Sequence, residues 1–170
     1  MANYRNMSPI LVDWRAAVLA GLAAGTLFLI LNLLLIPEII GGTTEVVLRY
    51  FASIVLGPEA VGPSTGFGIL TVITAVLLHY LLSIIFAIIV AYVVHRWGVV
   101  GGTIGGAILG LSIYLINMYT FTLLFPWFFT MENTIFLIVH IIFGAAVGAL
   151  YEVMERDEYE ERQGELGIEN

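Results

Sequence analysis

The chain has 170 residues, of which 60% are hydrophobic and only 11% are charged, and its formal net charge is −7 at pH 7. A soluble domain of this length carries a larger share of charged residues. Cysteine is absent, so disulfides, thiolate metal sites and cysteine nucleophiles are excluded. The six basic residues form no basic patch, which argues against nucleic-acid binding.

Four apolar segments are long enough to cross a membrane, at about residues 14–36, 68–95, 99–121 and 135–153. A helix rises about 1.5 Å per residue, so about 20 residues cross a hydrocarbon core of about 30 Å. We therefore expect an all-α membrane protein whose single domain, residues 14–153, is a four-transmembrane-helix bundle. Residues 1–13 and 154–170 flank it as an N-terminal segment and an acidic tail.

The positive residues are all arginine, and they are distributed unevenly along the chain. Arg49 lies alone between the first two spans, and the link between the last two has none. The remaining segments carry Arg5, Arg15, Arg96, Arg156 and Arg162. Because loops rich in Arg stay in the cytoplasm, we expect both termini there. Trp14, Trp97 and Tyr151 are then expected at the inner membrane interface, and the aromatic run 126–129 at the outer one.

The longest interruption, residues 33–66, separates the first two spans. Pro37 and the pair Gly41 and Gly42 are expected to end the first span. A short helix over about residues 43–56 is expected to follow on the outer face.

This outer helix has one polar face. Glu45, Arg49 and Ser53 recur every four residues, and Glu before Arg at this spacing favours an ion pair between Glu45 and Arg49. An amphipathic helix of this kind is either a surface helix with one ion pair or a lid over a site in the outer leaflet.

The two halves of the chain match when they are shifted against each other. A shift of 85 residues places the small residues and Asn32 of the first span on those of the third, and a shift of 61 places His79 on His140. The matched pairs are Ala16 and Gly101, Ala17 and Gly102, Ala20 and Gly105, Gly21 and Gly106, Gly25 and Gly110, Asn32 and Asn117, His79 and His140, Ser83 and Gly144, and Ala87 and Gly148. We interpret the chain as two hairpins, 14–97 and 99–155, that form a parallel repeat.

Glycines at four-residue spacing lie within three of the spans. They are Gly21, Gly25, Gly102, Gly106, Gly110, Gly144 and Gly148. Helix association in lipid depends on close packing, and such spacing lets a neighbouring backbone approach. The contacts are expected either within this bundle or against another subunit.

One polar residue from each span is expected at a common depth. Asn32, His79, Asn117 and His140 each lie roughly 22–27 Å from the cytoplasmic edge, counted along the helices. The four are expected to form a hydrogen-bonded layer that fixes helix register. Two alternatives are a site for protons or a small solute, and haem bound between His79 and His140. No metal site is expected, because a divalent ion needs more anionic or imidazole ligands.

The C-terminal end is strongly acidic. From Glu152 onward, eight acidic residues stand against two arginines. Such a run is typical of a solvated helix end, and the alternative is a surface that docks a basic partner.

Three stretches carry a resemblance: AAVLAGLAAG (16–25), RYFASIVLG (49–57) and HYLLSIIF (79–86). With the hairpin layout, the chain resembles small four-span prokaryotic membrane proteins of unknown function, some of them titled symporters. The resemblance implies a multi-pass protein of the prokaryotic cytoplasmic (inner) membrane and brings no reaction, ligand or catalytic residue.

The sequence contains no signature of catalysis, so no enzymatic activity and no cofactor are expected. The favoured interpretation is an accessory subunit of a larger membrane complex, such as a respiratory or electron-transfer complex, with other membrane subunits as partners. The alternatives are a small oligomeric transporter or channel that uses the Asn and His layer, and a haem-binding membrane protein.

Overall fold

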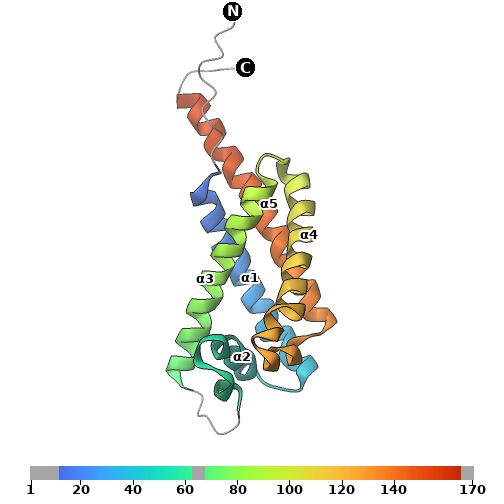
Figure 1. Ribbon diagram of the computed structural model, residues 1–170. Coiled ribbons are helices and arrows are strands. Elements are labelled where there is room, and N and C mark those ends of the chain that lie inside the picture. The colour runs from blue at the N-terminus through green and yellow to red at the C-terminus, as the bar shows by residue number, and fades with distance from the viewer. Residues whose placement is uncertain (1–11, 63–67, 166–170) are drawn as a thin grey trace, which may run out of the picture.

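The computed structural model describes residues 12–62 and 68–165, with side chains up to residue 155. The elements in chain order are α1 (Trp14–Ile40), α2 (Thr44–Leu56), η2 (Pro58–Val61), α3 (Ile69–Val94), α4 (Gly98–Tyr119), η3 (Phe121–Leu123), η4 (Pro126–Met131) and α5 (Thr134–Glu165), as Figure 1 shows. No strand occurs in this described part of the chain. Four of the helices, α1, α3, α4 and α5, are long and apolar enough to cross a membrane, which confirms the predicted all-α four-helix architecture of a multi-pass membrane protein.

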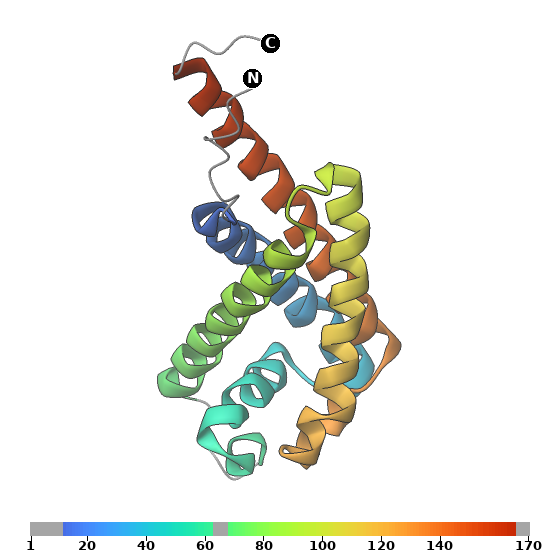
Figure 2. The same ribbon diagram turned by 45° about the horizontal axis from the view of Figure 1, so that its top comes forward.

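The bundle has two distinct ends. Helix α1 begins and helix α5 ends at one of them, here called the terminal end, whereas α2 and the 3-10 helices lie at the opposite, α2 end (Figure 1). Helix α4 packs mainly on α5, and α1 packs on both α5 and α3, but α3 and α4 have few contacts with each other. Figure 2 shows α3 and α4 spreading apart from the turn that joins them, with α2 lying between their far ends.

Helix α1 is longer than predicted, because Pro37 lies inside it and the helix ends at Ile40. Proline has no backbone N–H, so the carbonyl four residues earlier, that of Leu33, loses its helical partner. The Thr44 hydroxyl donates to this carbonyl instead, over 3.3 Å. Gly41 follows as the C-cap of α1, and its positive φ of 70° suits a residue without a side chain. Of the residues predicted to end the first span, Pro37 therefore lies one turn inside the helix, whereas Gly41 is at its C-terminus.

Helix α2 forms where the outer helix was predicted and carries the predicted ion pair. Arg49 Nη2 lies 2.7 Å from Glu45 Oε1. Arg49 also donates to the carbonyl oxygens of Ala60 and Gly62, so its side chain ties η2 to α2. Ser53 does not extend this polar face. It is fully buried and accepts a hydrogen bond from Trp127 Nε1 over 2.8 Å, which joins α2 to η4.

The seven glycines singled out in the sequence are all buried in contacts inside this chain. A side chain added at Gly106 would come within 3.0 Å of the Gly144 carbonyl, so the backbones of α4 and α5 touch. The contacts recur at equivalent positions in the two hairpins: Gly21 on Ala87, Gly25 on Ser83, Gly106 on Gly148, and Gly110 on Gly144. These pairs match under the shifts of 85 and 61 residues, so the repeated pattern packs a helix pair in each half.

The beginning of the acidic segment is not solvated, contrary to expectation. Glu152 is 5% exposed, and its carboxylate accepts from the backbone N–H groups of Trp97 and Gly98, over 3.0 and 2.9 Å. It thereby caps the N-terminus of α4, where unpaired N–H groups favour an anion. Glu155 pairs with His95. Arg5 and the side chains beyond Glu155 lie outside the described residues.

Tyr151 was expected at the lipid interface but is fully buried among the helices. Its hydroxyl accepts from the backbone N–H of Asp13 over 3.3 Å and lies 3.1 Å from His95 Nδ1. Asp13 in turn caps α1, because its carboxylate accepts from the N–H groups of Arg15 and Ala16. The terminal end is therefore tied together by hydrogen bonds from α1, α3, α4 and α5.

Candidate functional site

The weak contact between α3 and α4 leaves a pocket toward the α2 end, with a volume of about 160 Å³. Eight phenylalanines line it, from α1, α2, α3, α5 and the η3–η4 segment: Phe28, Phe51, Phe86, Phe121, Phe125, Phe128, Phe136 and Phe143. The four polar side chains in the lining are those of His79, Ser83, Asn117 and His140. None of the lining residues is an acid, a lysine or an arginine, so the pocket is uncharged apart from any proton on a histidine.

The helical repeat explains which residues of α3 and α4 form the walls of the pocket. The lining positions on α3 are Leu78, His79, Leu82, Ser83 and Phe86, which lie on one helical face. The glycine face of α4 packs against α5, and Ile113 and Asn117, nearer the α2 end of the same helix, line the pocket.

His79 is held between two aromatic rings. Its imidazole stacks on Phe28 at a centroid distance of 5.7 Å and on Phe51 at 5.8 Å. Nε2 lies 2.8 Å from the Gly25 carbonyl oxygen, and because a carbonyl only accepts, Nε2 carries the hydrogen. In the neutral imidazole Nδ1 is then an acceptor, and no hydrogen bond to it occurs within the described residues.

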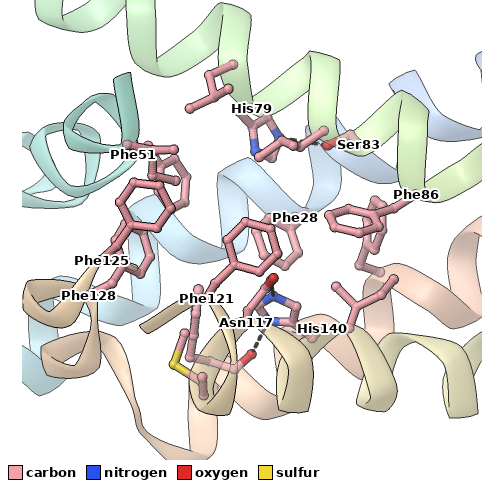
Figure 3. Close-up of a pocket in the computed structure, with 17 residues that line it drawn as sticks. Phe28, Phe51, His79, Ser83, Phe86, Asn117, Phe121, Phe125, Phe128 and His140 are labelled. Carbon is pink, nitrogen blue, oxygen red and sulfur yellow. Dashed lines mark hydrogen bonds between the residues drawn. The ribbon is translucent and has the colours of Figure 1, made fainter. Parts of the chain in front are cut away.

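Asn117 and His140 are joined on the opposite side of the pocket (Figure 3). His140 Nδ1 donates to the Phe136 carbonyl over 2.8 Å, which leaves Nε2 as the acceptor of the neutral ring. Asn117 Nδ2 donates to this Nε2 over 3.3 Å. This bond determines which end of the Asn117 carboxamide is the nitrogen. The carboxamide oxygen and the second N–H have no partner in the part of the chain that the structure describes.

The four predicted polar residues do not form one connected layer. His79, Asn117 and His140 line the pocket, but Asn32 does not. Asn32 is fully buried and donates to the Phe28 carbonyl over 2.8 Å, and its Oδ1 has no partner among the described residues. The physical reason is Phe28, whose ring contacts both imidazoles and occupies the space between them (Figure 3).

The same ring argues against the haem alternative. Iron would have to lie between the two imidazoles, where the Phe28 ring contacts His79 on one side and His140 on the other. Both Nε2 atoms also have hydrogen-bond partners already. The residues present therefore do not fit a haem. The described residues also contain no group of three or more acidic, His or Cys side chains that could hold a metal ion.

The sequence interpretation missed the aromatic lining. Phe128 belongs to the run expected at the outer membrane interface, yet it lines the pocket together with its neighbour Phe125. Phe51, on the outer helix, is buried and stacks on His79. The signal available was the number of phenylalanines, 10 in the chain, but their convergence from five segments is a tertiary property.

Comparison of the chain with protein-family models, curated proteins and solved structures finds no match.

Proposed function

We propose that this protein binds a neutral, mainly apolar small molecule that enters the pocket from the bilayer. One observation carries the proposal: a pocket lined by eight phenylalanines lies between two helices that could cross a membrane, and polar atoms of His79 and Asn117 in it have no partner among the described residues. Ligand sites are typically apolar cavities with a few polar groups that orient the ligand. The absence of charged side chains in the lining favours an uncharged molecule, since a buried charge needs a partner.

The route of entry follows from exposure. Among the lining residues, Phe121 is 46% exposed, and Leu78 and Leu82 of α3 are half-buried. These side chains are apolar, so a molecule dissolved in lipid meets no polar barrier there. With both termini in the cytoplasm, as the arginine distribution favours, the pocket would open into the outer half of the bilayer.

A matched pair of substitutions on α3 tests the proposal. Leu82 lines the pocket, whereas its neighbour Leu81 is 55% exposed on the outside of the bundle. Leu82→Phe should reduce binding of the neutral single-ring probe 4-decylphenol to the purified protein by at least about fivefold, because the added ring fills the cavity. Leu81→Phe should leave binding unchanged. Equal binding by the two variants would count against the pocket as the site.

We keep the accessory subunit as a second candidate because of α5. This helix continues to Glu165 and projects beyond the other helices at the terminal end (Figure 1). A projecting helix with acidic composition supports docking of a basic partner. The full chain should then co-purify with a larger protein in mild detergent, and deletion of residues 156–170 should release that protein. Recovery of the full chain only as a monomer or homo-oligomer would contradict this.

The transporter alternative has less support. A path from the pocket would have to continue toward the terminal end. There the fully buried Ala20, Ala87 and Val147 fill the centre of the bundle.

A further inference from the structure

We propose that the ligand of this pocket has a single six-membered ring bearing oxygen, as in a phenol or a quinone, with an apolar tail that extends into the lipid. This inference rests on the proposed function and adds the chemical class of the ligand. Three independent features support it: the volume of the pocket, the arrangement of its aromatic rings and the chemistry of the polar atoms that lack a partner in the described part of the chain.

The volume fits one ring. The pocket measures about 160 Å³. An engineered cavity of about 150 Å³ lined by Leu, Ile and Phe is known in another protein to hold benzene. A fused multi-ring head would therefore not fit without movement of the lining, whereas a single ring fits the measured space.

The aromatic side chains are already arranged for ring contacts. Phe28, His79 and Phe51 form a stack with interplanar angles of 19° and 7°. Phe28 also meets Phe143 edge to face at 5.5 Å. Aromatic pairs in such geometries gain about 0.5–1.5 kcal/mol beyond area burial. A ring in the pocket would gain this, and a saturated chain would not.

The polar atoms of the pocket lining favour a ligand that carries an uncharged oxygen. The Asn117 carboxamide has an unpaired oxygen and an unpaired N–H in the described structure, so it can accept from a phenolic hydroxyl or donate to a quinone carbonyl. His79, on the opposite wall, has an acceptor nitrogen without a partner there (Figure 3). With both histidines neutral, carboxylate, phosphate and ammonium head groups would lack a counter-charge, since no lining residue is an acid, lysine or arginine.

Four compounds with the same decyl tail test the contributions of the ring and of the oxygen separately. The protein is placed in phosphatidylcholine nanodiscs and titrated calorimetrically with 4-decylphenol, decyl-1,4-benzoquinone, decylbenzene and 1-decanol, and empty nanodiscs correct for partition into lipid. We expect the phenol and the quinone to bind at least about fivefold more tightly than decylbenzene, which lacks oxygen, and than decanol, which lacks the ring.

The outcomes are distinguishable. If none of the four binds above the empty nanodiscs, both the pocket function and this inference fail. If all four bind equally, the pocket function stands and the ring-and-oxygen inference is wrong. If decylphenol and decanol bind equally, the ring does not contribute to affinity. If decylphenol and decylbenzene bind equally, the oxygen does not contribute. Either result overturns the inference.

A substitution at Asn117 tests the assigned contact. Asn117→Leu keeps the approximate volume and removes the carboxamide, so affinity for decylphenol should fall about fivefold while that for decylbenzene stays the same. Ser112→Ala is the control on α4, because its hydroxyl donates to the Ile108 carbonyl of its own helix and does not line the pocket. Unchanged decylphenol binding by a folded Asn117→Leu protein would overturn the assignment, and the wild-type series stands even if this variant fails to fold.

Discussion

Glu152, in the last of the predicted spans, accepts a hydrogen bond from the backbone N–H of Gly98 over 2.9 Å. The same carboxylate accepts from the preceding N–H, that of Trp97. An acid in an acidic segment thus serves as the cap of a neighbouring helix, and the turn between α3 and α4 is attached to α5 through it.

Removing this cap should destabilise the protein. Glu152→Ala leaves two N–H groups without their charged acceptor at a buried position, and each such bond contributes about 1.5–3 kcal/mol. We expect a loss of about 3 kcal/mol and a clearly lower Tm in detergent. Glu132→Ala, at an exposed site, is the control and should stay within about 0.5 kcal/mol of wild type. Equal Tm values for the two variants would show that the cap contributes nothing.

The contact between α4 and α5 should not tolerate one added methyl group. Gly106→Ala would place a Cβ within 3.0 Å of the Gly144 carbonyl, and backbone cannot move aside as a flexible side chain can. Overpacking of this kind costs about 1–3 kcal/mol. Thermal unfolding should show a lower Tm for Gly106→Ala but not for Gly68→Ala, whose Cβ would meet nothing within 4 Å. A Gly106→Ala protein as stable as wild type would indicate that these helices lie further apart.

The bond between Ser53 and Trp127 should be measurable as a coupling energy. It is the side-chain bond through which η4 attaches to α2, with 2.8 Å between Nε1 and Oγ. A double-mutant cycle with Ser53→Ala and Trp127→Phe should give about 1 kcal/mol, the usual net value of one neutral hydrogen bond. Additive effects of the two substitutions would mean that the bond does not form in detergent.

The two matched asparagines should respond differently to replacement by leucine. Asn32 has a buried Oδ1 without a partner in the described residues, so Asn32→Leu removes an unsatisfied atom and should leave Tm unchanged or raise it. Asn117→Leu breaks the bond to His140 and should lower stability by about 1 kcal/mol.

The hydrogen-bonded layer predicted from the sequence gives a different result for this pair, because in such a layer both asparagines form hydrogen bonds between helices. Similar losses of stability for the two leucine variants would support the layer and contradict the structure. Circular dichroism during heating in detergent is sufficient to compare them.

The amino-acid sequence by itself determined the four spans, because the length and hydrophobicity of a segment decide whether it can cross a membrane, and both are local properties. It also determined the glycine pattern, whose four-residue spacing places small residues on one helical face wherever the helix packs. The ion pair between Glu45 and Arg49 is local in the same sense, since the two residues lie one turn apart.

Only the tertiary structure decided the partner of each polar side chain. Depth along a helix follows from residue number, so the common height of the four Asn and His residues could be counted from the sequence. Which of them meet depends on how each helix is rotated and on what fills the space between, and here that is Phe28. For the same reason the burial of Glu152 and the convergence of eight phenylalanines on one pocket could not be predicted, because both depend on helices that are far apart in sequence.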